Sequence, residues 1–229
     1  MGNVITRLPL FPLNTVLFPG VTMPLHVFEE RYRELVRDLL AQEDPKKRLF
    51  GVIAIREGYE VAGPLDGHGS QSLHTVGTVM QLVGVDPYDD GRFDIEVVGR
   101  QRLRLHEVDM TGSYGVGVVD LIEEPDDRDA RLEAERTLAT FETYRARLSV
   151  LRGDLVLEGE LPTDPTYLSW SLATTCLLTD AERQALLECP DAATRLALLR
   201  RSLVNEMRAM AVLPSLPATG IARMRWSPN

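Results

Sequence analysis

The chain has 229 residues, of which 44% are hydrophobic and 26% charged; this composition is typical of globular proteins and excludes a disordered or membrane-embedded chain. Its 34 acidic residues outnumber the 25 basic ones, and the formal net charge of −9 disfavours nucleic acid as a partner. Two cysteines are too few for a disulfide framework, and no stretch approaches the roughly 20 apolar residues of a membrane span, so we expect a cytoplasmic protein.

Strand-like segments dominate the first half of the chain. Residues 4–18 are apolar but interrupted by Pro9 and Pro12, a pattern typical of an edge strand or a bulged strand. A helix is predicted from Pro24, with His26 in its first turn. The evidence is a set of apolar residues that recur at steps of three and four, namely Leu25, Phe28, Tyr32, Leu35 and Leu39.

Short β-branched segments follow and predict further strands, at residues 49–57, 75–85, 92–105 and 114–124, with a glycine-rich loop at 63–72. Asp90-Gly91 predicts a tight hairpin turn between the second and third of these strands. In residues 92–105 most apolar residues occupy odd-numbered positions, whereas Arg100, Arg102 and Arg104 occupy even-numbered ones. We therefore expect the strand to have one core face and one solvent face. A bend is expected at Gly99. Such short, bent strands indicate a small curled sheet or partly open barrel.

The hydrophobic period becomes helical after Pro125. Residues 134–151 predict a long helix that ends near Gly153, and a second helix is expected after Pro165. Thr179 and Glu182 have the spacing of a capping box at the start of a third helix, and a fourth is expected from residue 191. The fold class is therefore α+β: a β subdomain at 1–124, a helical bundle at 125–213 and an irregular tail at 214–229.

Motifs for bond-making chemistry are missing from the sequence. The only lysines, Lys46 and Lys47, follow no glycine-rich loop, so no nucleotide-binding P-loop is expected, and their polar surroundings do not suit a Ser–Lys dyad. The four histidines are scattered along the chain, so we expect neither a metal nor a cofactor. The chain is therefore predicted not to be an enzyme.

Two alternatives stay open. The segment Asp66–Ser70 contains the three residue types of a hydrolase triad, although neighbouring side chains rarely converge and a solvated loop is the favoured interpretation. The stripe of Arg100, Arg102 and Arg104 offers a contact surface for RNA. Without interleaved aromatic residues, however, it is more typical of the solvent side of a strand.

Aromatic residues near predicted loops are the remaining candidates for partner contacts. Most are expected in the core, but some can serve as exposed anchors for a protein partner. Trp226 lies in the tail with Arg223 and Arg225, where no periodic pattern buries it. The full candidate set, with one arginine, is Phe11, Phe18, Tyr88, Arg102, Tyr114, Trp170 and Trp226.

The segment LPLFPLNTVLFPGVTMPLHVFEERYRELV at residues 8–36 resembles the opening of the Lon protease N-terminal domain, a substrate-binding module that also occurs as a stand-alone protein. Matching positions include Pro9, Phe11, Pro12, Pro19-Gly20, Pro24, Phe28, Glu29 and Tyr32. Later segments agree, among them Gly77-Thr78, Gly99, Asp164-Pro165 and Arg195-Leu196. The resemblance covers about residues 5–212.

This resemblance implies a PUA-like pseudo-barrel with one helix, followed by a helical bundle. It also implies a module that binds unfolded or exposed segments of client proteins, as an adaptor or regulator in proteolysis, with a protease as a second candidate partner. A full Lon protease carries ATPase and Ser–Lys peptidase modules as well. Neither Walker motif nor dyad occurs in these 229 residues, so ATP-dependent proteolysis is not expected of them. An RNA-binding PUA-like protein is the alternative.

Overall fold

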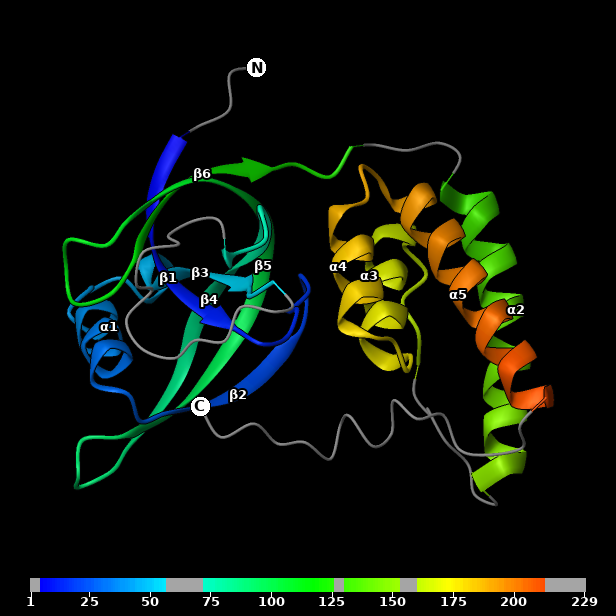
Figure 1. Cartoon of the computed structure of the whole chain (residues 1–229), viewed down its shortest axis with the longest axis horizontal. Helices are drawn as coiled ribbons and strands as arrows, with labels where there is room; N and C mark the ends of the chain where they lie inside the picture. The colour runs from blue at the N-terminus through cyan, green and yellow to red at the C-terminus, as the bar shows by residue number, and fades with distance from the viewer. Residues whose placement is uncertain (1–4, 57–71, 126–129, 153–159, 213–229) are drawn as a thin grey trace. The chain divides into compact units, whose positions relative to one another are not determined.

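The structure is a computed structural model that describes residues 5–56, 72–125, 130–152 and 160–212 (Figure 1). The chain separates into two compact units, with the boundary between Glu123 and Glu124. Strands occupy the first unit and helices most of the second, so the predicted α+β class is confirmed. No helix among the described residues is long and apolar enough to cross a membrane.

The first unit is a curled sheet of strands β1 (Ile5–Leu13), β2 (Thr22–Val27), β3 (Leu49–Ala54), β4 (Val76–Pro87), β5 (Phe93–Asp109) and β6 (Val116–Ile122). The strand order is β2-β5-β4-β3-β1-β6, and the long strand β5 also pairs with β6. This second pairing brings the sheet back onto itself, as expected for a pseudo-barrel. β1 lies inside the sheet and changes partner midway, pairing with β6 over Ile5–Pro9 and with β3 over Leu10–Leu13.

The helix predicted from Pro24 begins later than expected. Residues Thr22–Val27 form β2, which pairs antiparallel with β5, and helix α1 spans Glu30–Leu40 (Figure 1). The later members of the stripe, Tyr32, Leu35 and Leu39, do lie buried on α1. Leu25 and Phe28 have helical spacing by coincidence, because Leu25 pairs with Ile95 of β5 and Phe28 lies between the end of β2 and the start of α1. His26 therefore lies on a strand and not on a helix.

Two apolar clusters fill the β unit. The cluster beside α1 consists of helix residues and strand residues. The helix contributes Tyr32, Leu35, Val36 and Leu39, and the strands contribute residues such as Phe11, Phe50, Met80 and Val97. The other cluster consists of Leu8, Leu10, Ile53, Leu73, Val79, Leu103, Leu105 and Val119. Neighbouring residues such as Val79 and Met80 belong to different clusters, because alternate side chains of a strand point to opposite faces. Both faces of the sheet are thus buried over part of their area.

A bulge in β5 overturns the predicted arginine stripe. Val79 pairs with Gln101 while Met80 pairs with Gly99, so Arg100 is an extra residue between them. One extra residue reverses which face the following side chains occupy. Arg102 pairs with the buried Thr78, and only 2% of its surface is exposed. The expected solvent stripe is therefore wrong at Arg102.

Gly99 lies where two segments of backbone approach closely. Its N–H donates to the carbonyl of Val21 at 2.8 Å, and its own carbonyl accepts from the N–H of Gly20 at 2.9 Å. A Cβ atom at this position would collide with the carbonyl oxygen of Phe18. The position predicted as a bend therefore requires the absence of a side chain.

The second unit contains helices α2 (Ala130–Arg152), α3 (Pro165–Thr175), α4 (Asp180–Glu188) and α5 (Ala192–Val212), as the sequence predicts. The capping box is present: Thr179 Oγ1 accepts from the Glu182 N–H at 3.3 Å, and Glu182 Oε2 accepts from the Thr179 N–H at 2.9 Å. α2 and α5 pack along each other. The buried side chains of this pair include Phe141, Tyr144, Leu148, Leu196, Leu199 and Leu203.

Candidate functional site

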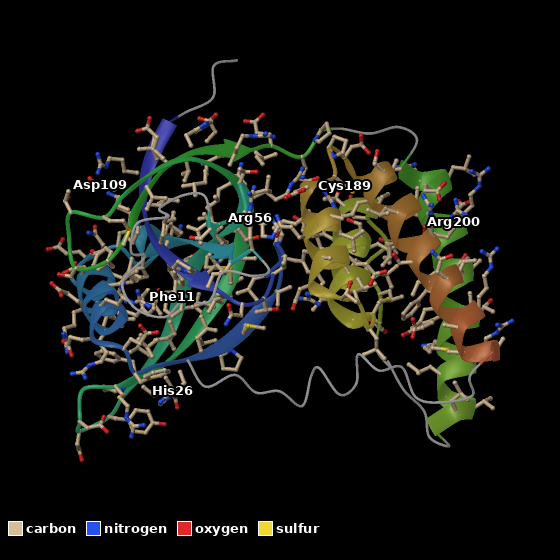
Figure 2. All side chains as sticks on the ribbon, viewed as in Figure 1. Phe11, His26, Arg56, Asp109, Cys189 and Arg200 are labelled. Atoms are coloured by element: carbon tan, nitrogen blue, oxygen red, sulfur yellow. The ribbon has the colours of Figure 1, made fainter. Side chains whose placement is uncertain are left out.

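Four of the seven candidate residues lie in the hydrophobic cores. Phe11 stacks on Tyr32 with ring centroids 4.1 Å apart, and Figure 2 shows it inside the β unit. Phe18 and Trp170 are buried, as is Arg102. Their side chains complete the packing of each unit, so they offer no exposed area to a partner in this structure.

Two further candidates, Tyr114 and Tyr88, reach the surface. The Tyr114 hydroxyl donates to Asp38 Oδ2 at 2.5 Å. Partial burial and this bond raise the pKa of Tyr114 to about 12. Tyr88 lies in the turn between β4 and β5 and exposes 44% of its surface. Trp226 and the Asp66–Ser70 segment lie outside the described residues.

A groove opens on the helical unit. Its volume is about 620 Å³, and it lies between one face of α2 and the non-helical segment that leads into α3. α2 contributes residues spaced three or four apart, which share a face of the helix. The other wall comes from residues 161–165 and the first turns of α3. The lining residues are Arg131, Ala134, Glu135, Leu138, Leu161, Pro162, Thr163, Asp164, Pro165 and Leu168.

The local sequence explains the shape of this groove. Asp164 is the N-cap of α3 and accepts hydrogen bonds from the N–H groups of Thr166 and Tyr167, at 3.0 and 3.1 Å. Pro165 occupies the first helical turn, where its fixed backbone angle is favourable. A proline also favours extended backbone in the residue before it, and Asp164 has this conformation. The groove is thus lined by leucines, prolines and an alanine, with Arg131, Glu135 and Asp164 as its charged groups.

A second surface lies at the β4–β5 hairpin. We call it the hairpin-tip surface; it consists of His26, Phe28, Tyr88, Arg92 and Asp94. Asp94 accepts from the Tyr88 hydroxyl at 2.5 Å and bonds His26 Nδ1 at 2.6 Å. Figure 2 shows His26 beside this turn. The hydrogen bonds from Tyr88 and His26 lower the pKa of Asp94, and the bond to Asp94 raises the pKa of Tyr88.

The turn of this hairpin has the geometry expected of Asp90-Gly91. Gly91 has a φ of 84°, a backbone conformation that residues with a side chain rarely adopt. Its N–H donates to the Tyr88 carbonyl, and the Tyr88 N–H donates to the Arg92 carbonyl, both at 2.9 Å. The predicted hairpin is therefore confirmed.

Ion pairs occur elsewhere as well, and some share a carboxylate, as Arg33 and Arg37 do at Glu30. His106 Nε2 lies 2.9 Å from Asp120 Oδ2. Among the described residues, no three His, Cys, Asp or Glu side chains are placed to hold a metal ion. Cys176 and Cys189 are buried thiols that are not joined by a disulfide bond.

Sequence reasoning missed most of both surfaces. His26 was assigned to a helix, and Asp94 meets it only through the β2–β5 register. The groove needs α2 and residues 161–165 to lie opposite each other, which no local pattern specifies. One signal was available: Leu161-Pro162 and Pro165 are apolar residues outside any periodic element.

Comparisons with known proteins agree with this architecture. The family described as the substrate-binding domain of ATP-dependent protease La (LON) matches residues 7–205. Lon protease 2 of Syntrophobacter fumaroxidans is 29% identical over 191 residues, which cover 81% of this chain and 22% of that protein. Lon protease of Escherichia coli (strain K12) is 26% identical over 209 residues, which cover 90% of this chain and 26% of that protein. The chain thus spans about a quarter of the length of these relatives.

Solved structures give the same result. A Lon N-terminal domain protein from Xanthomonas campestris is 29% identical, with a TM-score of 0.60, over 85% of this chain and 97% of that one. The N-terminal domain of Mycobacterium avium complex Lon protease shares the fold, with a TM-score of 0.61 at 18% identity, over 87% of this chain and 98% of that one. The resemblance seen in residues 8–36 is confirmed, and the chain belongs to the family of LON substrate-binding domains.

Proposed function

We propose that this protein is a non-catalytic module whose helical unit binds exposed, extended segments of client proteins in the groove between α2 and residues 161–165. The observation that carries the proposal is the groove itself, found in a member of a family described as substrate-binding. Its volume falls within the range of about 300–1,000 Å³ that is common for ligand sites.

The chemistry of the groove suits an apolar chain segment. Leu138, Leu161 and Leu168 supply area whose burial is favourable at roughly 25 cal/mol per Å². A folded client hides its own apolar side chains, whereas an unfolded segment exposes them. Selection for unfolded segments therefore needs no cofactor and no bond chemistry.

We place this activity in the cytoplasm, where the module holds clients as an adaptor or regulator in proteolysis. The family of its relatives supports that setting. RNA binding is the weaker alternative, since Arg102 lies in the core and not on the surface.

The test compares two glutamine variants on the same helix. Leu138→Gln places an amide in the groove, while Val150→Gln changes a side chain that is 83% exposed on α2 and does not line the groove. Binding of a short, neutral, leucine-rich fluorescein-labelled peptide is measured by fluorescence polarisation. We expect Leu138→Gln to weaken binding about tenfold and Val150→Gln to leave it unchanged.

Two results would contradict the proposal. One is equal affinity of the two variants for the peptide. The other is tighter binding of a single-stranded RNA than of the peptide at physiological salt. The Leu161→Ala variant repeats the test without a change in α2, because Leu161 lies outside any helix. Its expected loss is about fivefold.

A further inference from the structure

Three rings form a row on the hairpin-tip surface. The centroids of Phe28 and His26 lie 6.1 Å apart in a stacked arrangement, and those of His26 and Tyr88 lie 5.8 Å apart, edge to face. All three side chains are partly exposed, Phe28 by 37%. Aromatic area of this kind at the surface is typical of contact sites.

Hydrogen bonds hold two of the three rings, those of Tyr88 and His26, in place. Asp94 bonds both Tyr88 and His26, and β2–β5 pairing sets His26 opposite Asp94. The guanidinium of Arg33 lies so close to Gly91 that a Cβ atom there would meet its Nη2 at 2.7 Å. Because Asp94 already holds Tyr88 and His26, a ligand that contacts them costs little side-chain entropy at these two residues.

The surroundings of the rings are acidic. Residues 84–96 contain five carboxylates and one guanidinium, which gives this hairpin a net charge of −4. Asp86, Asp89 and Asp90 are exposed around the turn. An aromatic surface with negative neighbours attracts a cation both through the ring faces and through the carboxylates.

The hairpin already contains one example of this interaction. The guanidinium carbon of Arg92 lies 5.3 Å from the centroid of the Tyr88 ring, and Arg92 Nε donates to Asp90 Oδ2 at 2.8 Å. A ring and a carboxylate thus hold a guanidinium together. Phe28 and the remaining exposed area of Tyr88 offer ring faces to a second guanidinium.

We propose that the hairpin-tip surface binds arginine side chains of a protein partner, which stack on Phe28 and Tyr88 while the neighbouring carboxylates bond the guanidinium. This site lies in the β unit and differs in charge preference from the groove of the helical unit. The proposed arginine-binding site can therefore be tested independently of the proposed function.

The test uses a short fluorescein-labelled peptide of alternating serine and arginine and its matched peptide in which each arginine is citrulline. Citrulline keeps the shape of arginine but lacks its charge. Binding to the full chain is measured by fluorescence polarisation at low and physiological salt. We expect the arginine peptide to bind about tenfold more tightly at low salt, with the preference shrinking as salt screens the charges.

Variants locate this preference. Tyr88→Ala and Phe28→Ala should each weaken binding of the arginine peptide about fivefold. Tyr88→Phe keeps the ring and should retain most of the affinity. Val83→Ala, at an exposed position on β4, is the control and should bind like the wild type.

Three outcomes would overturn the proposal. The first is equal binding of the arginine and citrulline peptides. The second is an arginine preference that persists in both Tyr88→Ala and Phe28→Ala, or one that is lost in Leu138→Gln. Either result would place the arginine-binding site outside the hairpin-tip surface. The third is self-association of the wild type that Tyr88→Ala abolishes, measured by analytical ultracentrifugation, because the surface would then be an interface between two copies.

Discussion

The guanidinium carbon of Arg195 lies 3.3 Å from the centroid of the Trp170 ring. The same guanidinium donates to Ser169 Oγ at 2.8 Å and to both carboxylate oxygens of Glu124, at 3.0 and 3.2 Å. Its side chain is completely buried. One residue of α5 thus binds α3 and the first residue of the helical unit, and it packs against the buried ring of Trp170.

Loss of Arg195 should destabilise the helical unit strongly. Arg195→Met leaves the Glu124 carboxylate without its counter-charge and Trp170 without its stacking partner, and we expect a loss of about 3 kcal/mol in the free energy of unfolding. Urea unfolding followed by Trp170 fluorescence, in a Trp226→Phe background, gives this value.

Arg200→Met on the same helix is the matched control. Arg200 Nε donates to Glu133 Oε1 at 2.7 Å, but the Arg200 side chain is 37% exposed, so water stabilises its charge. Glu133 also keeps a second counter-charge when Arg200 is removed, because Arg136 Nη1 lies 3.5 Å from its Oε2. The expected cost is at most about 1 kcal/mol. Similar losses in the two variants would show that burial does not decide the contribution of Arg195.

Gly99→Ala should destabilise the β unit by about 3 kcal/mol, because its Cβ atom would displace the backbone at Phe18. Gly112→Ala is the control, since the nearest atom to a Cβ there lies 3.7 Å away. Hydrogen exchange of β4 and β5 amides measures both changes. Unchanged protection in Gly99→Ala would contradict the close approach.

Asp109 should make stability depend on pH in acid. Hydrogen bonds from Thr111 and from Arg7 lower the pKa of Asp109 from 3.8 to about 2. The stabilisation is complete above the unfolded pKa of 3.8 and is lost as the pH falls toward about 2. The difference in melting temperature between wild type and Asp109→Asn should therefore shrink over that interval. Glu107→Gln, on the same strand, controls for removal of a carboxylate, and a constant difference would contradict the assignment.

Local sequence patterns correctly predict those elements that are stabilised by contacts between residues close together in the sequence. Thr179 and Glu182 form the capping box, Asp90-Gly91 forms the turn, and the change to a helical period after Pro125 precedes α2. In each case the stabilising contacts lie within a few residues of one another, so the sequence contains the necessary information.

Long-range pairing explains the errors. Leu25 has a helical spacing to Phe28 and Tyr32, but it pairs with Ile95 of β5, and the strand alternation that predicts an exposed Arg102 is reversed by the extra residue Arg100. The groove escaped prediction for the same reason, because Leu138 and Leu161 meet across segments with no shared periodicity. Cross-strand register and helix packing depend on the whole unit.

Hydrogen exchange with and without the neutral leucine-rich peptide tests the central claim most directly, because it maps the bound segment onto the chain. We predict protection in residues 161–168 and in the first half of α2, with β4 and β5 unchanged. Protection confined to the β unit, or none at saturating peptide, would contradict a client-binding groove on the helical unit.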